Sequence, residues 1–111
     1  MSIKKAVRAA FRNAVLNRDG YRCAICCWRM DDVGTGLDAH HITDRNDARF
    51  RGTGGYVVEN GVTLCQHLCH PLAEQHHRTG EAHPGYAPDD LYALIGSSQE
   101  QAVGASLSRL G

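Results

Sequence analysis

Two pairs of cysteines constrain this chain more than any other feature of its sequence. Two residues separate Cys23 from Cys26, three separate Cys65 from Cys69, and a long interval lies between the pairs. Two such pairs can enclose one Zn²⁺ ion tetrahedrally, and four thiolate ligands leave no open position on the metal. We therefore predict a structural zinc site, which would help to stabilise the small core of a chain of 111 residues.

Two more residues lie close to these pairs. Cys27 follows Cys26 directly, and His67 lies inside the second pair, whose three-residue spacing is one longer than usual. Either residue could take the place of a thiolate, and the sequence leaves that open. Buried free thiols, or a redox protein that uses Cys26 and Cys27, are other interpretations. Grouped cysteines in odd number, five here, favour metal ligation over disulfides in a reducing compartment.

The charge is balanced overall but unevenly distributed. The chain has a formal net charge of zero, yet residues 1–30 carry seven lysines and arginines against one aspartate, a net charge of +6. A polyanion responds to the local field, so this segment is compatible with DNA as a partner. No stretch approaches the roughly 20 apolar residues of a membrane span, and the N-terminus lacks the apolar block of a signal peptide. We expect a soluble, cytoplasmic protein without a membrane partner.

The apolar residues of the N-terminal segment recur at helical spacing. Ile3, Val7, Phe11 and Val15 predict a helix over residues 3–17, with Gly20 at its C-terminal end. The opposite face is basic, and it is either a solvated surface or a contact surface for DNA. Its residues are Lys4, Lys5, Arg8 and Arg12.

The remaining pattern predicts short elements of both kinds. Residues 36–42 and 55–60 are typical of short strands or extended segments, and a turn at Asn60-Gly61 leads into VTLC. A helix beginning near His70 accommodates Pro71 in its first turn. After a linker over residues 78–88 we expect a short helix, PDDLYALI, and a last helix capped at Ser97 or Ser98. This last helix would present Val103, Leu107 and Leu110 on one side. The fold class is therefore small α+β.

Two neighbouring histidines lie inside the first predicted strand. Successive side chains of a strand face opposite sides, so His40 and His41 should have different surroundings and different roles. Asn60 follows at a turn, and His70 lies at the start of a helix beside Cys69. A zinc ion bound by Cys69 would fix His70 relative to the strand that carries His40.

The run from Cys23 to Glu74, CAIC…LDAHHITDR…GGYVVENGVTLC…CHPLAE, resembles the zinc-knuckle subgroup of the HNH endonucleases of phages and bacteria. The resemblance implies a single nuclease domain over residues 1–111. A ββα-metal core with its zinc site would occupy residues 21–79, between a basic helix in residues 1–20 and a helical extension in residues 80–111. It further implies hydrolysis of DNA phosphodiester bonds to 5′ phosphate and 3′ hydroxyl ends, in a bacterial or phage-infected cell.

The same resemblance implies a role for each residue of the motif. His40 and His70 would bind one catalytic cation, Mg²⁺ or alternatively Mn²⁺, Ni²⁺ or Zn²⁺. His41 would be the general base, for which a neutral imidazole is suited, and Asn60 would hold the intervening loop. Glu74 stands where many members of the family have another ligand. It is a further ligand, a carboxylate that orients His70, or a surface residue.

Departures from the family pattern and neighbouring residues complete the expectations. His70 lies ten positions after Asn60, one more than usual. His77, one turn beyond Glu74, has a weaker claim as a ligand, and we expect His76 and His83 to be solvated. Gly54 and Gly55 either let the backbone approach DNA or make a turn.

The predicted contacts to DNA are all basic side chains. Arg45 has the best claim, because an arginine at this place also resembles the family; Arg49 and Arg51 could equally be solvated. The predicted set is Lys4, Lys5, Arg8, Arg12, Arg45, Arg49 and Arg51. Cleavage of both strands would require a homodimer or two visits. The rival interpretation is a non-catalytic, zinc-stabilised module that binds DNA or protein.

Overall fold

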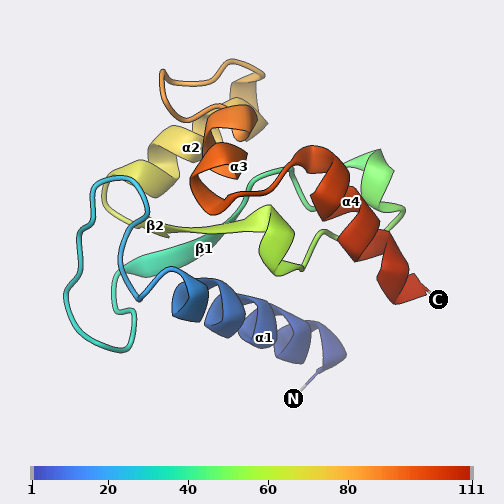
Figure 1. The fold of residues 1–111 in the computed structure, drawn as a ribbon, viewed down its shortest axis with the longest axis horizontal. Coiled ribbons are helices and arrows are strands. Elements are labelled where there is room, and N and C mark those ends of the chain that lie inside the picture. The colour runs from blue at the N-terminus through green and yellow to red at the C-terminus, as the bar shows by residue number, and fades with distance from the viewer. Residues whose placement is uncertain (1, 111) are drawn as a thin grey trace.

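A two-stranded antiparallel sheet lies at the centre of the computed structural model, which describes residues 2–110 (Figure 1). Residues 1 and 111, the ends of the predicted domain, lie outside the described residues. The helices and strands are α1 (Ile3–Arg18), β1 (Leu37–His41), β2 (Gly61–Cys65), α2 (Cys69–Thr79), α3 (Pro88–Ile95) and α4 (Gln99–Leu107). Three short 3₁₀ turns span Ala48–Phe50, Val58–Asn60 and Ser108–Leu110. The predicted α+β class is confirmed at this level.

Helix α1 packs along one side of the sheet, and its predicted range is confirmed to within a residue. Phe11 and Val15 are buried against the strands, whereas Ile3 at the start of the helix is 84% exposed. Gly61, the first residue of β2, allows this close approach. A Cβ atom at position 61 would lie 2.4 Å from Val15 Cγ2 and 2.8 Å from Phe11 Cζ.

Helices α2 and α3 lie across the sheet from α1, so that the sheet is a middle layer, and α4 lies beside it against the first two 3₁₀ turns (Figure 1). Helix α2 begins at Cys69, next to the predicted start, and ends at Gly80, which has a φ of 80°. The helix predicted from PDDLYALI is α3. Helix α4 is capped by Ser98, whose hydroxyl accepts a hydrogen bond from Gln101 N. Of its predicted apolar side, Val103 and Leu107 are half-buried, whereas Leu110 lies exposed in the 3₁₀ turn after the helix. The fully buried residues of α4 are Ala102 and Ser106.

The second strand does not lie where the pattern predicted it. Residues 55–60 are not a strand; they end in a 3₁₀ turn, and β2 begins at Gly61. Close packing explains the difference, since Gly55 lies so tightly against Phe50 and Asn60 that a Cβ atom there would come within 2.6 Å of both. The strands pair from Leu37 opposite Cys65 to His41 opposite Gly61.

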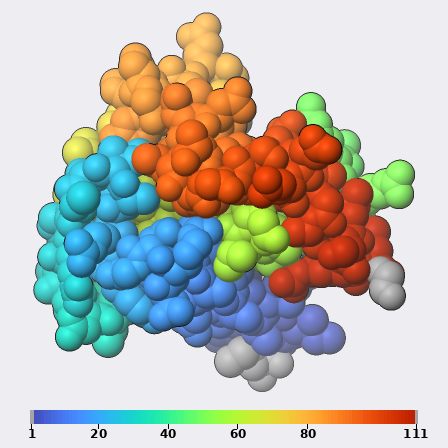
Figure 2. All heavy atoms as spheres, in the orientation of Figure 1, coloured from blue at the N-terminus to red at the C-terminus, as the bar shows by residue number. Residues whose placement is uncertain are grey.

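One hydrophobic core joins all parts of the described chain. It contains residues of α1, both strands and the C-terminal helices, among them Leu16, Leu37, Leu64, Leu91 and Ala102. In the view of Figure 2, α1 and the C-terminal helices close over the sheet, and β1 and β2 contribute little to the visible face. None of the helices in residues 2–110 has both the length and the apolar character needed to cross a membrane.

Candidate functional site

The four predicted cysteines come together at one end of the sheet. Ligand atoms of Cys23, Cys26, Cys65 and Cys69 all lie within 4.8 Å of one another. Cys26 Sγ and Cys65 Sγ are 3.7 Å apart. Four sulfurs at about 2.3 Å from a tetrahedral zinc ion would be separated by roughly 3.8 Å. This cluster could therefore hold a metal such as zinc, as the sequence predicted.

The surroundings of the cysteine cluster shift its thiols in opposite directions, because burial raises the pKa of Cys26 and of Cys69 whereas the pKa of Cys23 is lowered. Burial raises the pKa of the Cys23 thiol, but the backbone N–H groups of Cys26 and Ile25 outweigh burial and lower this pKa to about 7. Cys69 N donates to Cys65 Sγ at 3.3 Å, and the Tyr86 hydroxyl donates to Cys69 Sγ at 3.3 Å. Donors of this kind stabilise the charged form of a sulfur ligand.

The two residues that the sequence left open lie outside this cluster. Cys27 is exposed, and its backbone N–H closes the turn of the first cysteine pair by donating to Cys23 O at 3.0 Å. His67 is also exposed, and its ring packs edge-on against Trp28, with 4.9 Å between the centroids. The group of ligand atoms within 4.8 Å includes neither residue.

A second group of ligands joins β1 to α2. One ligand atom each from His40, Glu74 and His77 lies within 4.8 Å of the others. His40 is 1% exposed, and neither of its ring nitrogens has a hydrogen-bond partner in the described chain. Burial lowers the pKa of His40, and the neighbouring His40 and His70 lower the pKa of Glu74 to about 2. One ring nitrogen each from His40 and His77 and one oxygen of the ionised Glu74 form a donor set that fits a divalent cation.

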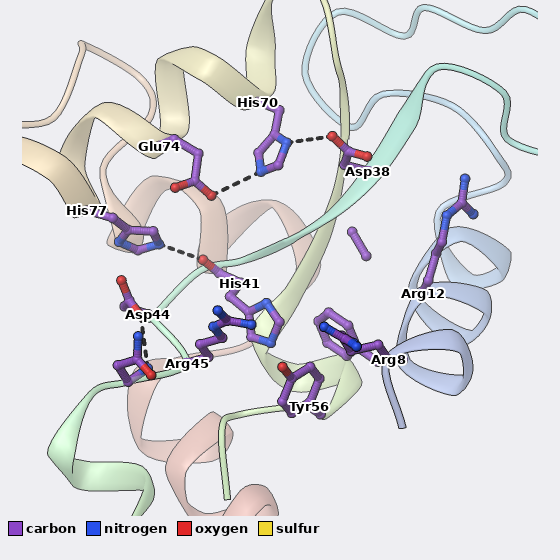
Figure 3. A pocket seen from close by; sticks show the side chains of 13 residues that line it. Arg8, Arg12, Asp38, His41, Asp44, Arg45, Tyr56, His70, Glu74 and His77 are labelled. Atoms are coloured by element: carbon purple, nitrogen blue, oxygen red, sulfur yellow. Dashed lines mark hydrogen bonds and ion pairs between the residues drawn. The ribbon is translucent and has the colours of Figure 1, made fainter. Parts of the chain in front are cut away.

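His70, the second predicted ligand, is connected to this group through Glu74. His70 Nε2 lies 3.1 Å from Glu74 Oε1, and His40 Nδ1 lies 3.3 Å from the same oxygen. The rings of His40 and His70 are 5.1 Å apart between centroids. On its other side, His70 Nδ1 is hydrogen-bonded to Asp38 Oδ2 at 2.7 Å (Figure 3). Burial lowers the pKa of His70, but the two carboxylates outweigh burial and raise this pKa.

His41 faces away from His40, as the alternation of a strand predicts. Its ring stacks on Phe11 of α1 with 4.6 Å between centroids, and the ring of Tyr56 lies edge-on to it at 4.7 Å. Burial lowers the pKa of His41 to about 4, with further contributions from His40 and Arg45. The imidazole is therefore neutral near pH 7 and able to accept a proton. His77 Nε2 donates to the backbone carbonyl of His41 at 2.8 Å.

Asn60 is fully buried and holds the loop between the strands. Its side-chain oxygen accepts from Thr43 N at 3.0 Å, and its side-chain nitrogen donates to Thr43 O at 3.0 Å and to Gly55 O at 3.2 Å. The Tyr92 hydroxyl of α3 donates to the same Asn60 oxygen at 2.7 Å. These bonds fix the backbone that follows His41.

The histidines border a pocket of about 600 Å³ between α1, β1 and α2 (Figure 3). Its lining includes His41, His70, Glu74 and His77 together with arginines from two segments, Arg8 and Arg12 of α1 and Arg45 of the loop. The other basic residues predicted to contact DNA, namely Lys4, Lys5, Arg49 and Arg51, do not line this pocket.

Arg12 has structural partners. Its Nη2 donates to Gly34 O at 3.0 Å and to Leu37 O at 3.2 Å. These bonds tie α1 to the segment that enters β1. A side chain used in this way contributes its charge to the pocket but has fewer donors left for a ligand.

Sequence reasoning missed several residues of the site. Asp38 could have been found, because it lies two residues before His40 and so on the same face of the strand. Phe11 and Tyr56 could not, since their contact with His41 depends on the packing of α1 and the loop. His77 had been given a weaker claim than the structure supports, although it continues the helical face of His70 and Glu74.

Comparisons of the chain with protein-family models, with curated proteins and with solved structures each gave no match. The geometry of the two clusters and of the pocket is therefore what indicates the function of the chain.

Proposed function

We propose that this protein is a metal-dependent endonuclease of the HNH type, which hydrolyses phosphodiester bonds in DNA. One observation supports the proposal above all others. Two adjacent histidines face opposite sides of β1, His40 towards a carboxylate and other histidines of α2, His41 towards a pocket lined by arginines. In this interpretation β1, β2 and α2 form the ββα-metal core, and the cysteines bind structural zinc.

The cation would be held by His40, Glu74 and a histidine of α2. One ring nitrogen of His40 and the ionised Glu74 would be donors to the cation, and His70 and His77 lie one helical turn before and nearly one turn after Glu74. A divalent cation at this place would neutralise the charge that develops on the phosphate and on the leaving oxygen. Asp38 then orients His70 through its Nδ1 atom, as carboxylates commonly orient metal-binding histidines.

His41 is the proposed general base. Its neutral ring would take a proton from the attacking water, while Phe11 and Tyr56 hold the ring and Asn60 holds the backbone beyond it. Arg45 lines the same pocket and would bind a phosphate oxygen beside the cut.

A nicking assay on supercoiled plasmid tests the proposal. Wild-type protein, loaded with zinc, is expected to convert the plasmid to open circles in the presence of Mg²⁺, Mn²⁺ or Ni²⁺. The His41→Ala variant should lose this activity by a factor of about 10² to 10⁴, the typical contribution of a general base. His83→Ala is the matched control, because His83 is exposed and does not line the pocket.

The far-UV spectrum and zinc content of both variants should equal those of wild type. A wild-type protein that binds plasmid but does not cut it with any of the three cations would reject the nuclease and leave the zinc-stabilised binding module. Equal cutting by wild type and His41→Ala would reject the assigned base.

A further inference from the structure

A second pocket continues the first one along α1. It has a volume of about 680 Å³ and shares Arg8, Arg45, Asn46 and Tyr56 with the pocket that contains His41. From this shared region it extends to Lys4 and to the glycines at positions 52 and 54. The residues His40, His70, Glu74 and His77, with Asp38 bonded to His70, are called the histidine cluster below. The two pockets form one continuous groove, hereafter the α1 groove, which starts at this cluster and ends near the N-terminus of α1.

Four cations line the α1 groove and have no ion-pair partner within residues 2–110, namely Lys4, Arg8 and Arg12 of α1 and Arg45 of the opposite wall. Arg12 is hydrogen-bonded to two backbone carbonyls, which leaves Lys4, Arg8 and Arg45 for a ligand. Arg8 and Arg45 lie at the junction of the two pockets, close to His41 (Figure 3). Lys4 is one helical turn from Arg8, about 5.4 Å along the helix axis.

Two carboxylates line the groove beyond the histidine cluster. Asp44 accepts a hydrogen bond from Asn46 N at 2.9 Å, and its charge offsets part of that of Arg45, so that three cations face one unpaired carboxylate. Asp47 forms an ion pair with Arg49 at 2.8 Å, and in this pair the two charges offset each other. Asp38 and Glu74 belong to the histidine cluster, where a divalent cation would offset their charge. Free positive charge therefore remains along the middle and far end of the groove.

We propose that the α1 groove binds the sugar-phosphate backbone of one DNA strand, which runs from the histidine cluster towards the N-terminus of α1. This inference rests on the proposed function and deepens it, because it selects Lys4, Arg8 and Arg45 from the seven basic residues that the sequence offered. Phosphates follow one another at about 3.4 Å along the axis of a strand, so Arg8 and Lys4 contact phosphates one or two nucleotides apart. Arg8 and Arg45 grip the phosphate nearest the cut from opposite walls.

The groove excludes basic residues that are close in sequence to those it includes. Lys5 is adjacent to Lys4 on the same helix and exposed, but it does not line either pocket. Arg51 is exposed in the loop and also lies outside both pockets. These two residues are matched controls, because each removes the same charge from the same region of the chain.

The test measures binding of the full-length, zinc-loaded protein to a labelled 20-base-pair duplex by fluorescence anisotropy, without added divalent cation. The dissociation constant is followed between about 50 and 200 mM salt for wild type, Lys4→Gln, Lys5→Gln, Arg8→Gln and Arg51→Gln. Each lost phosphate contact lowers the slope of log Kd against log salt by about 0.9. Raising the salt fourfold weakens binding of every variant. For Lys4→Gln and Arg8→Gln the factor by which Kd rises should be about three to four times smaller than the factor for wild type.

Lys5→Gln and Arg51→Gln are expected to keep the wild-type slope. Equal slopes for Lys4→Gln and Lys5→Gln, or an unchanged slope for Arg8→Gln, would overturn the groove and leave only a diffuse basic surface. Because no cutting occurs in this assay, its result is separate from that of the nicking assay. If wild type nicks DNA but Lys4→Gln and Lys5→Gln have equal salt slopes, only the proposed groove is refuted. If the slopes differ as expected but wild type does not nick DNA, only the nuclease activity is refuted.

Discussion

The cysteine cluster and the histidine cluster both attach α2 to the sheet, but they differ in what they leave free. The cysteine cluster draws all its ligands from thiols, and three of its four residues are buried. The histidine cluster has a half-exposed carboxylate, a buried His40 whose ring nitrogens have no hydrogen-bond partner in the described chain, and an open pocket beside it. A closed set of four ligands can only stabilise, whereas an incomplete set retains positions for water and substrate.

The two clusters are coupled through the chain. Cys69 and His70 are adjacent at the start of α2, so the position of one cluster determines that of the other. The comparison therefore predicts a hierarchy. Changes at the cysteines should abolish folding and function together, and changes at the histidines should abolish function and leave the fold intact.

Loss of a cysteine ligand should have the largest effect. Cys65 is fully buried at the end of β2, and serine is a poor zinc ligand. Structural zinc sites supply roughly 10 kcal/mol or more of apparent folding free energy in small domains, so Cys65→Ser should lack a cooperative thermal transition at 25 °C and above. Circular dichroism and zinc content measure this effect.

Cys27→Ser is the matched control for this change, because Cys27 is exposed and lies outside the cluster. It should retain one zinc ion per chain and the wild-type melting temperature. A folded, zinc-free Cys65→Ser protein would contradict the structural role of the cysteine cluster. Loss of zinc from Cys27→Ser would show that Cys27 is a zinc ligand, contrary to the four ligands assigned.

Replacement of the central carboxylate should have the next largest effect. Glu74 reaches both His40 and His70, and glutamine keeps its size while removing its charge. Glu74→Gln should weaken Mn²⁺ or Ni²⁺ binding by about 10- to 100-fold and lower plasmid nicking in proportion. Titration of the zinc-loaded protein with Mn²⁺, followed by electron paramagnetic resonance, measures the affinity directly.

The fold of the Glu74→Gln variant should remain, with its melting temperature within a few degrees of wild type. Glu81→Gln removes the same charge from an exposed residue just beyond α2 and should change neither property. If Glu74→Gln unfolded like Cys65→Ser, both clusters would be structural, and the proposed difference between a stabilising cluster and a functional one would be wrong.

The sequence predicted the cysteine cluster more completely than the histidine cluster, for a physical reason. Metal-binding cysteines occur in pairs whose spacing is local, so Cys23, Cys26, Cys65 and Cys69 can be identified without a fold. The strand alternation that separates His40 from His41 is equally local. Helix periodicity also located α1 and α3 correctly.

Long-range packing decided what the sequence could not predict. The true position of β2 depends on Gly55 and Gly61, which admit Phe50, Phe11 and Val15 at close range. The most buried side of α4 was not predicted, because it contains Ser106, a polar residue whose hydroxyl meets Thr53 and the backbone N–H of Gly55. The same kind of long-range contact brings Phe11 of α1 onto His41, which no spacing in the sequence indicates.

Removing the stacking contact between Phe11 and His41 should have the smallest effect. This change tests whether α1 contributes to catalysis or only to the fold. Phe11→Leu retains an apolar side chain of similar size but removes the ring that stacks on His41. An aromatic pair contributes about 0.5–1.5 kcal/mol beyond its buried area, which corresponds to a two- to tenfold loss in rate if the stack orients the base. We expect the kcat of nicking to fall by this factor, with KM and Mn²⁺ affinity unchanged.

Val15→Ala is the control, because it perturbs a fully buried residue of the same helix that packs against Gly61. It should lower the melting temperature without lowering kcat at temperatures well below the transition. Equal kcat values for wild type and Phe11→Leu would assign α1 to the scaffold alone, as would equal losses in the two variants, because a purely structural contribution of Phe11 predicts no difference between them.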